Sequence, residues 1–174
     1  HRFGTPEPVG TARLAMAPWS TVTMAPDGFH CYLLDAPAGQ LACLAIPSLE
    51  LTWQQSLRQS VAIAVSPDGA TMAWAGGFHA GLLETATGRE ISSFRQPCEI
   101  IARIAFAGPQ HLMLSSYDQT LVFASLASAA VTLESRRQPA CAELLCSSDL
   151  GRWLSIDLQN QLNWFPPPSR NLPP

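Results

Sequence analysis

The stretch that decides the fold is AVSPDGATMAWAGGFHAGLLETATGRE, residues 64–90. Short apolar runs in it are separated by three turn signals: Ser66-Pro67-Asp68-Gly69, Gly76-Gly77 and Thr87-Gly88. Pro67 fixes φ at a turn corner, and Gly69 permits a positive φ there. Short runs between closely spaced Gly, Pro and Asp signals are typical of antiparallel strands. No helical period persists, so the stretch predicts an all-β unit.

Each unit of this kind is expected to form four short strands. In residues 61–94 the predicted strands are Val61–Val65, Thr71–Ala75, His79–Glu84 and Glu90–Phe94. Their boundaries follow directly from the turn signals, because each Gly- or Pro-containing turn ends one run and starts the next.

The unit recurs along the chain. Residues 28–39 read GFHCYLLDAPAG and residues 77–88 read GFHAGLLETATG, an offset of 49 (77 − 28). Residues 102–106 resemble residues 61–65 at an offset of 41 (102 − 61), and a fourth unit begins near Cys141. A repeat of roughly 40–50 residues with four strands matches one blade of a β-propeller.

Particular motifs resemble those of a known family. The Ser66–Gly69 turn, the later Thr87-Gly88 and the stretch SSYDQTLVFAS (residues 115–125), with Asp118 at its turn, are similar to the Trp-Asp (WD) repeat of β-propellers. In that family Trp-Asp ends the third strand of a blade; the corresponding dipeptides here are Leu34-Asp35, Leu83-Glu84, Ala124-Ser125 and Trp164-Phe165. No unit carries the family's Gly-His dipeptide, so the family's buried His-Asp-Ser/Thr-Trp hydrogen-bond network is not expected.

The expected fold class is therefore all-β, a β-propeller-like array of about four four-stranded blades in residues 11–165. Residues 1–10 and 166–174 are rich in Pro and are expected to form an extended N-terminal arm and a Pro-rich C-terminal tail. Leu49–Ser60, between the first two units, is expected to hold a short helical turn. Propellers have four to eight blades, and the resemblance implies seven as the commonest number. An open ring leaves two apolar blade faces in water, so we expect a ring completed by another chain or by missing sequence.

Composition excludes several classes of function. The net charge is −3 and all ten cationic residues are Arg, so neither a basic nucleic-acid surface nor lysine chemistry is expected. No apolar run is long enough to span a bilayer. The five cysteines form no Cys-x-x-Cys pair, which disfavours a zinc site and favours buried, reduced thiols. We expect a bacterial, cytoplasmic protein without a cofactor.

The titratable residues suggest turn chemistry rather than catalysis. Asp27, Asp68 and Asp149 each fall in the turn after the first strand of a unit, where Asp binds backbone N–H groups. His30 and His79 each follow Gly-Phe and are expected to occupy equivalent places. Two histidines on neighbouring blades could face one channel, but a metal site needs three or more ligands. Neither an enzyme nor a metal site is expected.

The favoured function is a non-catalytic protein–protein interaction or assembly scaffold, with a protein partner or self-association through the blade faces. The candidate partner-binding residues are exposed aromatic, histidine and arginine side chains of the connecting segments: Trp53, Arg58, Phe78, His79, Tyr117, Arg136 and Arg137. Two alternatives stay open. One is a small-molecule or metal-binding propeller, enzymatic or not, that uses His30 and His79; the other is the C-terminal sensory module of a longer regulatory protein.

Overall fold

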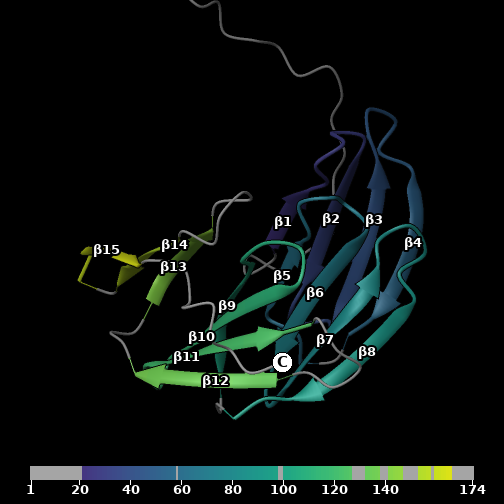
Figure 1. Cartoon of the computed structure of the whole chain (residues 1–174). Coiled ribbons are helices and arrows are strands. Elements are labelled where there is room, and N and C mark those ends of the chain that lie inside the picture. Colours follow the sequence, from purple (N-terminus) through teal and green to yellow (C-terminus); the bar gives the residue numbers. More distant parts are fainter. Residues whose placement is uncertain are drawn as a thin grey trace, which may run out of the picture.

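The computed structural model describes residues 21–57, 59–97, 100–126, 132–137, 141–146, 153–157 and 159–165. Every regular element within these ranges is a β-strand, and all paired strands are antiparallel (Figure 1). The predicted all-β class is confirmed. No helix in the described residues is long and apolar enough to cross a membrane.

The strands form four separate sheets, which we call blades 1 to 4. Blade 1 consists of β1 (Thr21–Met24), β2 (His30–Asp35), β3 (Gln40–Ala45) and β4 (Leu51–Ser56). Blade 2 consists of β5 (Ala62–Val65), β6 (Thr71–Gly76), β7 (His79–Glu84) and β8 (Glu90–Arg95). The four strands predicted for this unit are confirmed to within one residue at each end.

Blade 3 consists of β9 (Ile101–Phe106), β10 (His111–Ser116), β11 (Thr120–Ser125) and β12 (Thr132–Arg137). In blade 4 the described strands are β13 (Cys141–Cys146), β14 (Trp153–Asp157) and β15 (Leu162–Phe165). The predicted arm and tail, residues 1–10 and 166–174, lie outside the described residues, as do residues 11–20 and Asp149.

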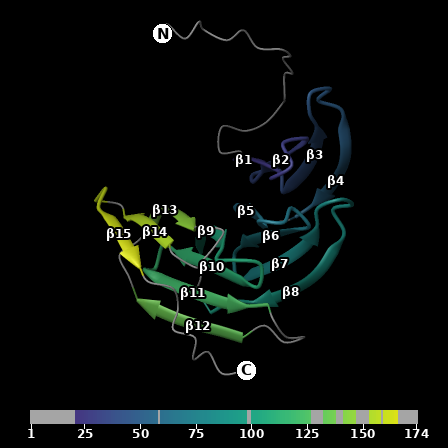
Figure 2. The ribbon, with the colours of Figure 1, turned by 45° about the horizontal axis from the view of Figure 1, so that its top comes forward.

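The blades are arranged side by side around their first strands. β1 contacts β5, β5 contacts β9, and β9 contacts β13. Figure 2 shows the resulting arc, in which β4, β8 and β12 lie on the outside and blades 1 and 4 occupy the two ends. The described strands thus form a propeller whose ring is not closed.

Apolar side chains fill the junctions between blades. Between blades 1 and 2 the buried cluster includes Tyr32, Leu34, Met72, Trp74 and Leu83. Between blades 2 and 3, alanines of blade 2 receive the larger side chains of blade 3: Ala62, Ala73, Ala75 and Ala80 against Ile104, Phe106, Leu112 and Leu114. Each blade therefore buries its faces against its neighbours rather than within itself.

The strand directions give the array two distinct ends. The described turns after the first and third strands lie at one end, called the Asp27 end; it includes residues 25–29 and 85–89. The described turns after the second strands, and the described parts of the connections between blades, lie at the other, called the Phe78 end; it includes residues 77–78, 96–97, 100 and 117–119.

Two sequence predictions are wrong. Leu49–Ser60 contains no helical turn among its described residues; instead Leu51–Ser56 is β4, the outer strand of blade 1. Its alternation of exposed and half-buried residues reflects a strand with one face turned to solvent. The 49-residue offset is also wrong, because the pairing registers of the first two strands match at 41: Val22 pairs with Leu33 as Ile63 pairs with Trp74.

Gly76→Ala is expected to destabilise the protein by about 2–3 kcal/mol, the cost of overpacking a tight contact. A Cβ at Gly76 would lie 1.8 Å from the carbonyl oxygen of Gln59, in the connection between blades 1 and 2. The matched control is Gly28→Ala, where a Cβ meets nothing within 4 Å and only the positive φ of 74° is strained. That control should cost about 1 kcal/mol, and equal losses in urea unfolding would contradict the proposed clash.

Acid unfolding should depend on Asp68, whose carboxylate organises the first turn of blade 2. Ser66 Oγ donates to Asp68 Oδ1 at 2.6 Å, and the Ala70 N–H donates to the same oxygen at 3.0 Å. The Ser66 hydroxyl bond is the largest cause that lowers the pKa of Asp68. A lowered folded-state pKa stabilises the protein above the unfolded pKa of about 3.9, and this is lost as the pH falls through the folded value.

Asp68→Asn should therefore lower the urea midpoint at pH 6, and the difference from the wild type should shrink as the pH falls from about 5 to 2. Glu90→Gln on the outer strand β8 is the control. A difference between Asp68→Asn and wild type that stays constant over this pH range would show that the carboxylate charge is not responsible.

Candidate functional site

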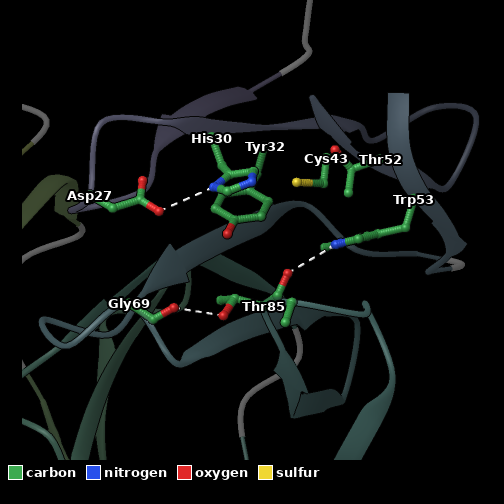
Figure 3. A pocket seen from close by; sticks show the side chains of 9 residues that line it. Asp27, His30, Tyr32, Cys43, Thr52, Trp53, Gly69 and Thr85 are labelled. Carbon is green, nitrogen blue, oxygen red and sulfur yellow. Dashed lines mark hydrogen bonds and ion pairs between the residues drawn. The ribbon is translucent and has the colours of Figure 1, made fainter. Parts of the chain in front are cut away.

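A cleft of about 140 Å³ lies between blades 1 and 2 at the Asp27 end (Figure 3). Blade 1 contributes Asp27, His30, Tyr32, Cys43, Thr52 and Trp53, and blade 2 contributes Gly69, Thr85 and Ala86. The lining therefore combines turn residues with side chains of β2, β3 and β4.

A β-bulge shapes the wall formed by β4. Cys43 pairs with Trp53 whereas Leu44 pairs with Leu51, so Thr52 is the extra residue on β4. A bulge re-aims side chains that strict alternation would place on opposite faces. Thr52 and Trp53 both line the cleft for this reason.

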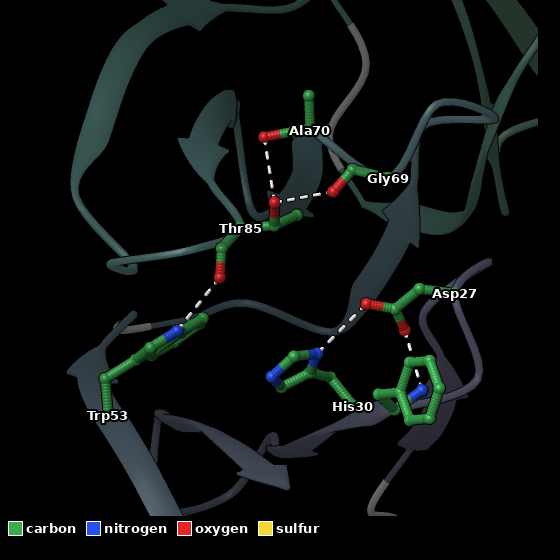
Figure 4. A network of polar contacts seen from close by, with 7 residues as sticks. Asp27, His30, Trp53, Gly69, Ala70 and Thr85 are labelled. Atoms are coloured by element: carbon green, nitrogen blue, oxygen red, sulfur yellow. Dashed lines mark hydrogen bonds and ion pairs between the residues drawn. The ribbon is translucent and has the colours of Figure 1, made fainter.

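Trp53 connects the two blades through what we call the Thr85 bridge, the hydrogen bonds made by Trp53 and Thr85. Trp53 Nε1 donates to the carbonyl oxygen of Thr85 at 2.9 Å (Figure 4). Thr85 Oγ1 in turn lies 2.6 Å from the carbonyl oxygen of Gly69 and 2.9 Å from that of Ala70, and it donates toward both. The indole ring lies over Gly88, where a Cβ would come within 2.6 Å of it. The bridge therefore ties the outer strand of blade 1 to two turns of blade 2.

A contact between a carboxylate and an imidazole also lines the cleft. Asp27 Oδ2 lies 3.1 Å from His30 Nδ1, and Asp27 Oδ1 accepts the Phe29 N–H at 2.7 Å. The Phe29 N–H is the largest cause, followed by His30, that lowers the pKa of Asp27. Asp27 is therefore ionised at neutral pH, and it performs the turn role predicted for it and for Asp68.

Deeper in the cleft, burial keeps the titratable groups neutral. Tyr32 is only 2% exposed, and burial raises its pKa to about 12. Burial also raises the pKa of the Cys43 thiol, which makes it a poor nucleophile because only the thiolate is reactive. The described lining residues thus supply a carboxylate–imidazole pair without an ionised thiol beside it.

His30 and His79, which were predicted to occupy equivalent places, lie at opposite ends of the array. They therefore cannot form one site together. His30 begins β2 at the Asp27 end, whereas His79 begins β7 at the Phe78 end. Both follow Gly-Phe because both start a strand after a turn, but the turns belong to different strand pairs. No group of three or more His, Cys, Asp or Glu in the described residues could hold a metal ion.

Most of the candidate partner-binding residues lie at the Phe78 end instead. Phe78 and Tyr117 are 42% and 56% exposed in the turns of blades 2 and 3, and His79 adjoins Phe78. Arg136 and Arg137 pair through the backbone with Leu121 and Thr120, close to the same end. Trp53 is separated from this group by its place in the cleft, and Arg58 lies outside the described residues.

One exposed apolar residue at the Phe78 end, Ile100, was not among the candidates from the sequence. Ile100 is 54% exposed and its carbonyl oxygen accepts the Tyr117 N–H at 3.2 Å, which places the two residues together. The signal was the doubled Ile100-Ile101 before β9: Ile101 is fully buried, so its neighbour must point away from the core.

Comparison with known proteins finds similarity in fold but not in sequence. No family model matches the chain, and no curated protein matches it in sequence. Among solved structures, the chain is similar to the RRP9 WD40 repeats (14% identity, TM-score 0.70, 83% of this chain and 50% of that chain). It is likewise similar to U3-55K (14%, TM-score 0.67, 83% and 50%) and to hydrazine synthase of Kuenenia stuttgartiensis (14%, TM-score 0.72, 83% and 45%).

The fold is thus that of WD40-repeat propellers, as the sequence resemblance implied. The chain spans about half the length of these three solved structures: the match covers 50%, 50% and 45% of their chains.

Thr85→Val is expected to cost about 1–2 kcal/mol of unfolding free energy, because it removes the hydroxyl of the Thr85 bridge while preserving the side-chain shape. Thr87→Val is the matched control two residues away: Thr87 is exposed and bonds Glu84 at 2.5 Å, so a loss of about 0.5 kcal/mol or less is expected. Chemical denaturation of both variants gives the comparison. Equal losses would mean that the bridge contributes no more than an exposed turn contact.

Proposed function

We propose that this chain is a non-catalytic interaction module that binds other proteins through its Phe78 end. The observation that carries the proposal is the exposure of Phe78, Ile100 and Tyr117 together on the turns and connections of blades 2 and 3. Exposed aromatic side chains on a fixed framework are typical of binding surfaces.

The backbone beneath these side chains is held in place. The Gln96 N–H donates to the Phe78 carbonyl oxygen at 2.9 Å, and Gln96 Nε2 donates to that of Gly77 at 2.8 Å. Ser116 Oγ donates to the Ile100 carbonyl oxygen at 2.7 Å. A surface that is already ordered loses little conformational entropy on binding, which favours affinity.

The neighbouring charges indicate the chemistry of the partner. Arg95 lies over the Phe78 ring, 5.5 Å from its centroid, so a cation borders the apolar surface. His79 adjoins it, and Arg136 and Arg137 belong to the strand that ends nearby. A partner segment with apolar side chains flanked by Asp or Glu would complement this end.

Two further observations support this reading, and a third concerns the environment of the protein. The WD40-repeat fold hosts many functions, so its support for a scaffold is by analogy. In the cleft, the Thr85 bridge and the Asp27–His30 pair already use the main polar groups within the chain. Cys31 and Cys43 are free and buried, which supports a reducing, cytoplasmic environment.

The test is selection of peptides from a random displayed library on the immobilised full chain. We expect enriched peptides with apolar residues flanked by acids, and at least a tenfold weaker binding to Phe78→Ala and Tyr117→Ala. Phe29→Ala is the matched control, because Phe29 is 66% exposed at the Asp27 end. Peptides that lose binding to the Phe29 variant alone would overturn the proposal.

A further inference from the structure

Two aromatic rings border the cleft between blades 1 and 2. Tyr32 and Trp53 both line it, with their ring centroids 6.0 Å apart and their planes inclined by 37°. Tyr32 is only 2% exposed, so its ring is largely withdrawn from water. Aromatic rings attract cations within about 6 Å of the ring centroid, and more strongly where water is excluded. This pair of rings therefore gives the cleft a wall suited to a cation.

A negative charge belongs to the same lining. Asp27 and Trp53 stand on opposite sides of the cleft in Figure 3, with Tyr32 between them. The Asp27 carboxylate is ionised at neutral pH, because the Phe29 N–H bonded to it lowers its pKa. The described lining residues include no arginine, and His30 is paired with this carboxylate. The charges around the cleft therefore favour a cation over an anion.

The volume of the cleft limits the size of its ligand. The cleft encloses about 140 Å³, whereas sites for drug-sized molecules enclose roughly 300–1,000 Å³. A cavity of roughly 150 Å³ is large enough for benzene. The cleft therefore has room for one compact group of similar size, and not for an extended molecule.

The hydrogen-bond acceptors of the lining already have partners within the chain. The Thr85 carbonyl oxygen accepts Trp53 Nε1, and the Gly69 carbonyl oxygen accepts Thr85 Oγ1. Both carboxylate oxygens of Asp27 likewise have a partner. A primary ammonium brings three N–H donors, and leaving them unpaired outside water costs free energy. A trimethylammonium group has no N–H, so aromatic rings and a nearby negative charge are enough to bind it.

We propose that this cleft binds a small organic cation with a trimethylammonium head group, held by the rings of Tyr32 and Trp53 with Asp27 as the counter-charge. The Thr85 bridge fixes the indole ring in advance, so the ring loses little conformational freedom on binding. The same head group occurs in free cations such as choline and at the end of a trimethylated lysine side chain. The site lies at the Asp27 end, so it is independent of the binding proposed for the Phe78 end.

The direct test is titration of the full chain with choline, followed by NMR spectroscopy or calorimetry at concentrations up to tens of millimolar. We expect saturable binding that is at least tenfold tighter than that of dimethylbutanol, the uncharged analogue in which carbon replaces the nitrogen. Equal binding of the two would overturn the proposal, because the cleft would then recognise shape and not charge. Absence of saturable binding both by choline and by a peptide with trimethyllysine would also overturn it.

Asp27→Asn tests the counter-charge. It removes the negative charge but keeps an oxygen for the Phe29 N–H, and it should weaken choline binding at least threefold. Asp35→Asn is the matched control, because Asp35 also accepts a backbone N–H in a turn of blade 1, that of Ala38 at 3.2 Å, but at the Phe78 end. Asp35→Asn should leave choline binding unchanged, and equal effects of the two variants would contradict the role of Asp27.

Two substitutions of Trp53 separate its ring from its hydrogen bond. Trp53→Leu and Trp53→Phe both remove the bond to the Thr85 carbonyl oxygen, but only Trp53→Phe keeps an aromatic ring. We expect at least a tenfold loss of choline binding for Trp53→Leu and a clearly smaller loss for Trp53→Phe. Equal losses would overturn the role of the ring.

A pair of peptides that differ only in trimethylation of one lysine identifies the source of the head group. Tighter binding of the methylated peptide than of choline would assign the head group to another protein, and tighter binding of choline would assign it to a free cation. Both results support the site. Tighter binding of the unmethylated peptide than of the methylated one would overturn the preference for a methylated cation.

Discussion

The structure depends on the need of every blade to cover two apolar faces. A four-stranded antiparallel sheet cannot bury its faces within itself, so each blade requires a neighbour on both sides. Small side chains on one blade lie against large side chains on the next: Ala73 and Ala75 of blade 2 make room for Ile104 and Phe106 of blade 3. A larger side chain at either alanine would push adjacent blades apart, because these junctions are packed like any protein core. The blade spacing is thus set by residue volume.

The cleft at the Asp27 end is a consequence of this packing. Blades that meet closely at their first strands diverge toward their outer strands, and polar groups then fill the space between them. Trp53 reaches across from β4 to the Thr85 carbonyl oxygen, and Gly88 is required because the indole ring occupies the space of a side chain. This hydrogen bond holds the two sides of the cleft, β4 of blade 1 and the Thr85 turn of blade 2, at a fixed separation. The contact from Trp53 to the Thr85 carbonyl oxygen thus joins blade 1 to blade 2 across the cleft.

The sequence was informative where turn chemistry is unambiguous, and misleading where one motif serves two turns. The strands of blade 2 were predictable because Pro or Gly marks their turns. The Gly-Phe-His matches were misread because Gly28 and Gly77 both adopt positive φ (74° and 55°) before a new strand, at opposite ends of the array. Only pairing register separates them. β4 was missed because an outer strand of polar residues lacks an apolar pattern, and Trp53 could not be placed because its partner, Thr85, is 32 residues away in sequence.

Two kinds of surface remain exposed: the faces of blades 1 and 4, and the turns at the Phe78 end. A contact made through one does not block the other. The faces of blades 1 and 4 are sheet surfaces that look along the ring, so anything that covers them extends the array. Phe78, Ile100 and Tyr117 sit on turns and connections, which point away from the sheet faces and are unaffected by what continues the ring. Contacts made through the faces of blades 1 and 4 therefore do not exclude contacts made through the turns at the Phe78 end.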